Sequence, residues 1–487
     1  MTDLLTGLQN ASTITNTKGG EYYATSYNSN LDLFSGVSRY DDEATIKRKY
    51  ANAYQEDNEM ALANLLYLLD IRGGKGERKI FKICFDWLCN HNANDAKRIM
   101  PFIAELGRWD YLLVALNTPV ECDAINMISC QLKLDLVSDY PSLLGKWMPS
   151  IRTHGKNNPQ ASYLARILGL SEKEYRKMLS SLRSKINIVE KNLTEKQYEN
   201  IRFEQVPTKA MLKYMNTFKE KIADPYKQYL ESVNNGEKKI NTTGLYCYEI
   251  IRKISNARGF WNETINEEDT KLFDLMWKNQ KNFLKGNDTN VLVMADTSGS
   301  MYGMPLDNAI GLALYIAERN HGYFHDCFMT FSERPQFQKV SGKTIVDKVL
   351  NVESIIANTD IDKAFEMLLN TCVENNIPQE EVPTHIIIIS DMEFDRGVYS
   401  ENGTNFNGWR KAFQEKGYKL PNILFWNVGY DTEGLPVTKN DNDVCMISGF
   451  STTILQSILN IENYDPVDVM KEILKPYFVM LERRRIA

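Results

Sequence analysis

Three oxygen-bearing side chains follow an apolar run at alternate positions in the segment Asn290-Val-Leu-Val-Met-Ala-Asp-Thr-Ser-Gly-Ser300. Asp296 ends the run, and Ser298 and Ser300 follow it two and four positions later. Hard divalent cations prefer oxygen ligands, and short side chains on one tight turn can converge on a single ion. The segment therefore predicts part of the coordination shell of a divalent cation.

A second acidic residue ends another apolar run, in the segment Thr384-His-Ile-Ile-Ile-Ile-Ser-Asp391. Thr359 lies between the two runs, and its hydroxyl is a further oxygen ligand. Continuous apolar runs bounded by polar turns predict fully buried strands of a parallel sheet. Ligands of open α/β sheets bind beyond the carboxyl ends of the strands. We therefore expect Asp296 and Asp391 to face the same crevice.

The Asp-x-Ser-x-Ser turn, the later threonine and the strand-ending Ser-Asp pair resemble the metal-ion-dependent adhesion site of von Willebrand factor A domains. The resemblance implies that Ser298, Ser300 and Thr359 offer hydroxyl oxygens to the ion. Asp296 and Asp391 would supply the negative charge, partly through water. The implied ion is Mg²⁺, with Ca²⁺ or Mn²⁺ as alternatives, and an open coordination position would accept an acidic side chain from a partner protein. By itself the Asp-x-Ser-x-Ser motif is a common polar turn, so the prediction depends on all five residues in context.

Strands and helices alternate from about residue 287 onward. Strands are predicted at 291–296, 325–332, 384–390 and 422–428. Helices are predicted at 305–319, 361–374, 407–416, 450–461 and, finally, 466–485. Alternation at these lengths predicts a doubly wound, parallel α/β domain over residues 287–487.

The first 286 residues lack this alternation. Residues 1–36 are rich in Ser, Thr, Asn and Gly and predict an extended N-terminal arm. Residues 37–286 contain successive apolar patterns at helical spacing. Ser171 and Glu174 form a capping box at the start of one predicted helix. Many short helices with brief turns favour a stacked, solenoid-like all-α domain.

Charge is divided unevenly along the 487 residues, whose formal net charge is −6. Residues 1–290 hold 40 Lys and Arg against 36 Asp and Glu, and residues 291–487 hold 17 against 27. Within residues 151–260 the count is 21 basic against 11 acidic. The basic excess suggests an anionic partner for the middle of the chain. Ordinary solvated helix faces are the alternative explanation.

A helical domain followed by an A-type domain resembles the Ro autoantigen family, in which a ring of helical repeats, the TROVE module, precedes the A domain. A Ro-related family found in viruses, plants and other eukaryotes is more similar still. The implied fold is a HEAT-like helical-repeat ring or solenoid followed by a von Willebrand factor A domain. The segments that carry the resemblance are Leu31-Asp-Leu-Phe34, Asp70-Ile-Arg-Gly-Gly-Lys-Gly-Glu-Arg78, Glu105-Leu-Gly-Arg-Trp-Asp-Tyr-Leu-Leu113, Gly145-Lys-Trp-Met-Pro149, Val206-Pro207, Lys238-Lys-Ile-Asn241, Asn358-Thr-Asp-Ile361 and Ser390-Asp-Met-Glu-Phe-Asp395.

The Ro resemblance implies that the helical domain binds small structured or misfolded RNA, and that single-stranded ends pass through a basic central hole. Such binding needs cations for the phosphates and planar side chains that stack on bases. Trp147 lies among basic residues in the middle of the chain. For any one of these residues alone, a core or solvated side chain is the simpler explanation. The residues predicted to contact RNA are Lys146, Arg152, His154, Lys156, Arg176, Lys177, Arg183 and Lys185.

The sequence contains no recognisable catalytic constellation, so we expect a binding protein and not an enzyme. The glycine-rich segment from Arg72 to Lys79 follows a helix and lacks the phosphate-loop pattern, so it predicts a helix cap and turn. The main alternative function is a metal-dependent interaction or virion structural protein that does not bind RNA. A metal-dependent nuclease that uses Glu393 and Asp395 near the ion is the least favoured alternative.

Composition indicates a globular cytoplasmic protein, or a protein of the host cytoplasm if the chain is viral. Hydrophobic residues make up 43% of the chain and charged residues 25%. No apolar run approaches the roughly 18 residues that span a bilayer, and the N-terminus lacks the pattern of a secretory signal. The eight cysteines are scattered, which predicts reduced and mostly buried thiols.

Overall fold

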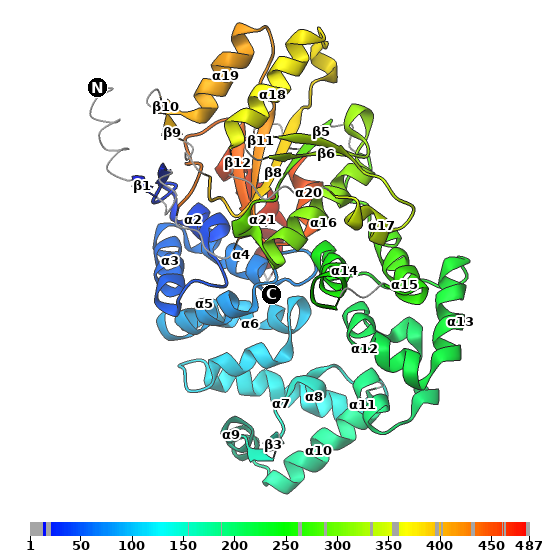
Figure 1. Cartoon of the computed structure of the whole chain (residues 1–487). Helices are drawn as coiled ribbons and strands as arrows, with labels where there is room; N and C mark the ends of the chain where they lie inside the picture. Colours follow the sequence, from blue (N-terminus) through cyan, green and yellow to red (C-terminus); the bar gives the residue numbers. More distant parts are fainter. Residues whose placement is uncertain are drawn as a thin grey trace. The chain divides into compact units, whose positions relative to one another are not determined.

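The computed structural model groups the 487 residues into two compact units, each assembled from two stretches of chain (Figure 1). The α/β unit contains residues 1–64 and 242–476, and the helical unit contains residues 65–241 and 477–487. The predicted domain boundaries at 36/37 and 286/287 stay predictions. The structure describes residues 13–15, 21–153, 155–186, 188–261, 265–286, 290–331, 335–352, 360–394, 399–400, 403–429, 434–459, 461 and 464–483.

A six-stranded sheet in the order β12-β11-β8-β5-β6-β7 forms the centre of the α/β unit. The five strands from β12 to β6 pair in parallel, and β7 pairs antiparallel with β6. Strands β5, β6, β8 and β11 lie where the sequence predicts strands, to within two residues. The strands are β5 (Val291–Asp296), β6 (Cys327–Phe331), β7 (Gln336–Lys339), β8 (His385–Ser390), β11 (Asn422–Asn427) and β12 (Val444–Ser448).

The edge strands β7 and β12 were not predicted from the sequence. Only four residues separate β6 from β7. A parallel pair needs a crossover of a dozen or more residues, so the chain turns back and the sheet is mixed. β12 is a short apolar run that follows a polar turn, and its five residues are all buried. The helix predicted at 450–461 is confined to a 3-10 turn and the single helical turn α20 (Leu455–Ile458).

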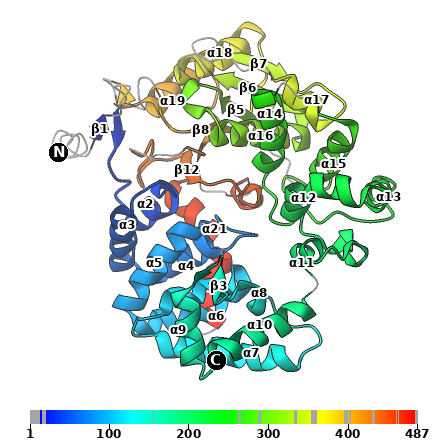
Figure 2. The same ribbon diagram turned by 60° about the horizontal axis from the view of Figure 1, so that its bottom comes forward.

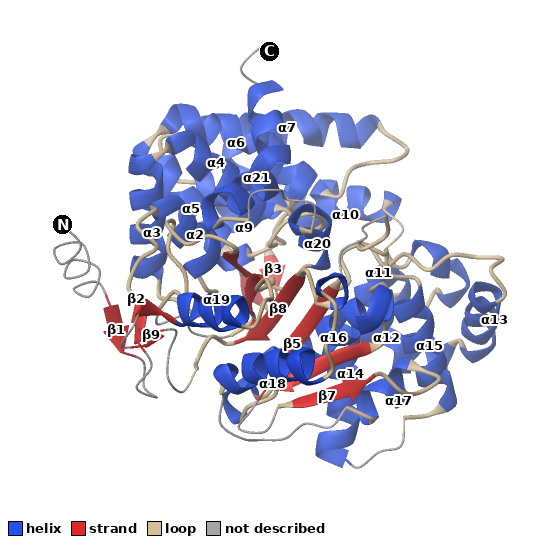
Figure 3. Cartoon of the chain, turned by 90° about the horizontal axis from the view of Figure 1, so that it is seen from above, coloured by secondary structure: helices blue, strands red, loops and turns tan. Residues whose placement is uncertain are grey.

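Helices cover both faces of the sheet, which explains why β5 and β8 are buried along their whole lengths (Figure 3). On one face, Met294, Ile388 and Phe425 pack in a single core cluster with residues of α18 (Ile361–Glu374) and α19 (Asn405–Glu415). The opposite face contacts α16 (Met304–Arg319), which touches β5, β6 and β8. A sheet covered on both sides requires strands that are apolar at every position.

Helix α16 is itself buried between the sheet and α14 (Cys247–Trp261). A Cβ at Gly311 would lie 3.0 Å from the Cys247 Cβ, so the glycine allows the two helices to approach closely. Helix α14 belongs to the α/β unit. The other elements of this unit are β1 (Thr13–Thr15), β2 (Glu21–Tyr23), α3 (Glu43–Glu56), α15 (Glu267–Lys278), α17 (Ile345–Leu350), β9 (Tyr399–Ser400) and β10 (Gly403–Thr404).

Residues 1–36 were predicted to form an extended arm, but the last part of this segment is helical. Helix α2 (Ser29–Gly36) begins after Asn28, whose side chain accepts a hydrogen bond from the Leu31 N–H. Leu31 and Phe34 are buried, so the helix is held by tertiary packing as well as by its cap.

The helical unit consists of short helices and one small hairpin (Figure 2). The capping box predicted at Ser171 and Glu174 is present at the start of α10. The boundaries between the units fall within α4 (Asn58–Leu69), between residues 241 and 242, and within α21 (Pro466–Arg483). No helix among the described residues is long and apolar enough to cross a membrane. The unit contains α5 (Arg78–His91), α6 (Ala93–Leu106), η1 (Trp109–Ala115), α7 (Glu121–Val137), α8 (Leu144–Trp147), β3 (Arg152–Thr153), β4 (Lys156–Asn157), α9 (Pro159–Ile167), α10 (Glu172–Lys185), α11 (Val189–Thr194), α12 (Thr208–Lys221) and α13 (Ala223–Asn234).

The combination of a helical part with an α/β part agrees with the predicted fold class. The HEAT-like ring and the von Willebrand factor A character of the α/β part stay predictions.

Candidate functional site

The two predicted acidic metal ligands lie at the carboxyl ends of neighbouring strands. Asp296 is the last residue of β5, and Asp391 directly follows β8. The strands pair in parallel, with Ala295 opposite Ile389. The chain continues from β5 to β6 on one side of β5, whereas β8 lies on the other. The carboxyl ends of β5 and β8 therefore lie at the topological switch point, where open α/β sheets bind their ligands.

One serine hydroxyl joins the two carboxylates. Ser390 Oγ donates a hydrogen bond to Asp296 Oδ2 at 2.6 Å and lies 3.4 Å from Asp391 Oδ1. The Ser298 N–H donates to Asp296 Oδ1 at 2.8 Å, and the Ser298 and Ser300 hydroxyl oxygens are 3.1 Å apart. Four of the five predicted ligands thus belong to one hydrogen-bonded group, together with Ser390, which was not among the predicted ligands.

Thr359, the fifth predicted ligand, lies outside the described residues. Among the residues that the structure does describe, no three His, Cys, Asp or Glu side chains form a cluster. A cation at this site would therefore depend on two carboxylates, on hydroxyl groups and on water.

The electrostatics of the site favour a cation. Asp296 is fully buried and Asp391 is 6% exposed. Burial and the negative charge of Asp391 raise the pKa of Asp296 to about 6. A divalent ion would remove the repulsion between the two carboxylates, and a donor set made only of oxygens suits a hard ion such as Mg²⁺. The residues present therefore fit the predicted ion, with Asp296 and Asp391 supplying charge and Ser298 and Ser300 supplying hydroxyls.

The predicted RNA-contacting residues lie in three elements of the helical unit. Lys146 belongs to α8, two residues belong to the β3–β4 hairpin, and four belong to α10. His154 lies outside the described residues. Four cations are exposed and have no carboxylate within 4 Å among the described residues: Arg152, Lys156, Arg176 and Lys177.

Arg183 and Lys185 donate hydrogen bonds to backbone acceptors. The Arg183 guanidinium donates to Gly145 O at 2.8 Å and to Met148 O at 2.7 Å, and burial lowers the pKa of this side chain. Lys185 Nζ donates to Leu136 O at 2.8 Å and to Ser138 O at 3.0 Å. These donors are therefore already used in holding α10 against neighbouring segments.

Arg108 was not among the predicted residues, although it contacts Trp147 closely. Its guanidinium carbon lies 3.6 Å from the Trp147 ring centroid. Asp110 orients the guanidinium through two hydrogen bonds, of 2.8 and 2.7 Å. Trp147 is half-buried, so its ring is neither a core side chain nor a free one. Both residues lie in segments that carry the Ro resemblance, but nothing in the local sequence indicates that they meet.

Lys146 lines a cavity of about 260 Å³ in the helical unit. Its polar lining includes Arg202 and Gln205, which are exposed, and Glu190, which pairs with Lys146 at 3.8 Å. Apolar walls with a few polar groups are typical of small-ligand sites, and an unpaired base needs such walls when it leaves a stack. The apolar lining residues are Leu143, Ile186, Ile188, Val189, Ile201, Val206 and Pro207.

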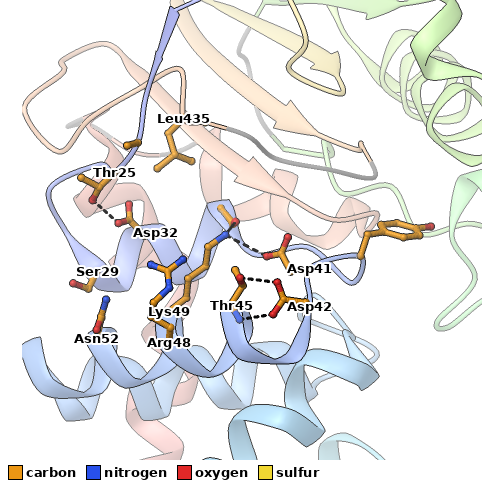
Figure 4. Close-up of a pocket in the computed structure, with 14 residues that line it drawn as sticks. Thr25, Ser29, Asp32, Asp41, Asp42, Thr45, Arg48, Lys49, Asn52 and Leu435 are labelled. Carbon is orange, nitrogen blue, oxygen red and sulfur yellow. Dashed lines mark hydrogen bonds and ion pairs between the residues drawn. The ribbon is translucent and has the colours of Figure 1, made fainter. Parts of the chain in front are cut away.

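A larger cavity of about 750 Å³ lies beside α2 and α3 in the α/β unit (Figure 4). Asp32 accepts a hydrogen bond from Thr25 Oγ1 at 2.5 Å, and Lys49 pairs with Asp41 at 3.2 Å. Asp42 caps α3. The three carboxylates are thus already satisfied by internal donors, so we assign no ligand to this cavity.

Comparisons with known proteins relate the chain first to two classes of domain. Residues 290–475 match a domain of unknown function, DUF7788. Residues 16–95 and 135–287 match another domain of unknown function, DUF2828. The chain is 28% identical to the uncharacterized protein L728 of Acanthamoeba polyphaga mimivirus, over 94% of this chain and 86% of that protein. It also aligns with the crystal structure of the Ro (RSR) protein of Deinococcus radiodurans, with a TM-score of 0.48, 14% identity and coverage of 93% of this chain and 99% of that one.

Proposed function

We propose that this chain is an RNA-binding scaffold of the Ro type, in which the helical unit binds structured or misfolded RNA. The observation that carries the proposal is the charge of the helical unit. Its residues include 31 Lys and Arg against 21 Asp and Glu, a balance of +10, whereas the α/β unit has 26 against 42, a balance of −16. A polyanion is the natural partner of such a unit, since phosphate neutralisation supplies most of the affinity for RNA.

Two local features support RNA over other polyanions. The cations Arg152, Lys156 and Lys177 are exposed and able to contact phosphates. The cavity beside Lys146 offers apolar walls to one unpaired base, and Trp147 directly follows Lys146 in the sequence. We therefore expect RNAs that contain single-stranded segments to bind more tightly than fully paired ones.

The test is a fluorescence-anisotropy titration of the full chain with a labelled hairpin RNA and a labelled single-stranded RNA, across a salt series. Replacing Arg152, Lys156 and Lys177 together by alanine should reduce the salt slope by about 1 for each phosphate that the variant no longer neutralises. Lys411→Ala is the matched control, because Lys411 is 78% exposed and lies in the α/β unit. Absence of binding at low salt would end the RNA proposal.

We further propose that the oxygen cluster at the ends of β5 and β8 holds a divalent ion to which a partner protein adds an acidic side chain. The donor set supports this use, because two carboxylates and weak hydroxyl ligands leave coordination positions to water or to a partner. Asp296→Ala should abolish both Mg²⁺ binding, measured by calorimetry, and capture of an acidic partner protein. Glu415→Gln in α19 is the control, because this side chain is 64% exposed and far along the chain from the ligands.

A metal-dependent interaction or virion structural protein without RNA is the competing proposal, since the ion site does not depend on the basic residues. The ratio of absorbance at 260 and 280 nm of the purified protein separates the two: nucleic acid that co-purifies supports the RNA scaffold. The scaffold proposal also implies binding without cleavage. RNA that is degraded during long incubation with Mg²⁺ or Mn²⁺ and the full chain would support the nuclease instead.

A further inference from the structure

We propose that Arg78, Lys82 and Arg108, none of them among the predicted basic residues, form a second phosphate-binding site that takes a phosphodiester of the RNA backbone. The inference rests on the proposed RNA-binding function and adds to it residues that the sequence did not indicate.

The three cations surround one carboxylate. Asp110 Oδ2 lies 3.3 Å from an Arg78 nitrogen, 3.9 Å from Lys82 Nζ and 2.7 Å from an Arg108 nitrogen. All three cations also lie over the Tyr111 ring, 5.1 to 5.8 Å from its centroid. Asp110 neutralises one positive charge, so the cluster keeps an excess of two.

The cluster lies at the start of a helix. Arg78 is the first residue of α5, and Lys82 is one turn further along the same face. The first turn of α5 contains no acidic residue, and the N-cap residue Glu77 is acidic but its side chain does not cap the helix. The free N–H groups and the dipole at a helix N-terminus attract anions. The helix and the three side chains therefore favour the same kind of ligand.

The cations are held in place but stay accessible. Asp110 and the Trp147 ring fix Arg108, whose side chain is 23% exposed, whereas the side chains of Arg78 and Lys82 are 53% and 31% exposed. Burial lowers the pKa of Lys82, and Arg78 and Arg108 lower it further against the opposing effect of Asp110. A bound phosphate would relieve this repulsion, because it adds a negative charge where cations outnumber carboxylates.

A purely structural ion-pair network is the competing explanation for the same contacts. It predicts that loss of Arg78 and Lys82 lowers the stability of the helical unit and leaves RNA binding unchanged. If the three residues form a phosphate site, loss of Arg78 and Lys82 changes stability little, because exposed cations contribute little to it. The same loss lowers the salt dependence of RNA binding, to which these cations contribute much.

The experiment measures binding of the full chain to a labelled single-stranded RNA across a KCl series. Arg78→Gln/Lys82→Gln is expected to reduce the salt slope by about 1 to 2 and to weaken binding several-fold at moderate salt. Lys97→Gln is the matched control, because Lys97 is 47% exposed, lies in the same unit and pairs with Asp123 at 3.2 Å. The melting temperature is measured for every variant. If the double variant melts several degrees lower, the single variant Arg78→Gln is used to test the site, and its salt slope is expected to fall by about 1.

The outcomes separate the two proposals. If the unmodified chain does not bind RNA at low salt, both fall. If it binds RNA and the salt slope of the double variant equals that of Lys97→Gln, this site is overturned and the RNA scaffold stands. If the slope falls in the double variant but not after replacement of Arg152, Lys156 and Lys177, this site stands and the predicted basic residues are excluded.

Discussion

The hydroxyl of Tyr477 donates a hydrogen bond of 3.0 Å to Asp70 Oδ2, across 407 positions of the chain. The other oxygen of Asp70 accepts the N–H groups of Arg72 and Gly73, at 2.8 and 3.0 Å. A Cβ at Gly74 would lie 2.2 Å from the Tyr67 carbonyl oxygen. The glycine-rich segment is therefore a packed turn against the C-terminal helix, and its glycines are required by space.

Tyr477→Phe should lower the free energy of unfolding by about 1 to 3 kcal/mol, because it removes one hydrogen bond and leaves a buried Asp70 oxygen without that donor. Gly74→Ala should cost more, since a backbone oxygen blocks the added methyl group. Urea unfolding followed by circular dichroism measures both. Tyr140→Phe serves as the control, because Tyr140 is 94% exposed, and an equal loss in that variant would contradict the argument.

Gly429→Ala should weaken Mg²⁺ binding without a change in any predicted ligand. A Cβ at this position would lie 2.7 Å from the Asp391 Cβ and 2.8 Å from its Cα, so the ligand must move. We expect at least a tenfold higher dissociation constant, about 1.4 kcal/mol or more, measured by calorimetry.

The matched control for this variant is Gly408→Ala. A Cβ at Gly408, within α19, has nothing within 4 Å. This substitution should leave Mg²⁺ binding unchanged and stabilise the helix by roughly 0.5 to 1 kcal/mol. Equal Mg²⁺ affinity in both variants would argue against Asp391 as a ligand.

Arg183→Ala should lower stability without lowering the salt slope of RNA binding. Its guanidinium also donates to Ser150 Oγ at 2.8 Å, so the variant leaves several partly buried acceptors without their donor. A loss of about 1 to 3 kcal/mol in the free energy of unfolding is expected. Lys177→Ala should show the opposite pattern: unchanged thermal melting with a slope lower by about 1. A reduced slope in Arg183→Ala would restore this arginine as an RNA contact.

Stability should fall in mild acid because of His385. Burial lowers the pKa of this histidine to about 4, from 6.5. The unfolded chain therefore takes up a proton at higher pH than the folded chain, so stability is present above pH 6.5 and is lost as pH falls toward 4. The expected loss from pH 7.5 to pH 5 is about 2 kcal/mol.

His385→Gln isolates this effect from that of other titrating groups. Urea midpoints of the variant and the unmodified chain at the two pH values give the difference in pH dependence. His385 stacks edge-on against Tyr464 with ring centroids 5.2 Å apart, so the variant is expected to be less stable at pH 7.5 as well. An identical pH dependence in both proteins would show that His385 does not titrate in this range.

Local patterns were sufficient for the central strands and for the two acids at their carboxyl ends. The runs that end at Asp296 and Asp391 are apolar at every position because helices cover both faces of the sheet, and such runs are visible in the sequence. The position of an acid at the end of a buried strand then places it at the ligand-binding edge. Ser390 could have been found in the same way, because it directly precedes Asp391.

The edge of the sheet and the roles of individual cations were not predictable from local patterns. β7 is half-exposed and short, so its pattern is weak, and its direction follows from a connection of four residues. Arg183 and Arg176 are alike in type and lie on the same helix, yet Arg183 donates to buried acceptors while Arg176 is exposed.

The sequence by itself determined that the chain combines a helical part with an α/β part and that two buried apolar strands each end at an acid, because both features depend on periodicity within a few residues. Only the tertiary structure decided which distant residues share a unit. It brings Arg108 against Trp147, and it groups the charges into balances of +10 and −16. The physical reason is that packing and electrostatics act through space, so residues far apart in the chain contribute to one surface.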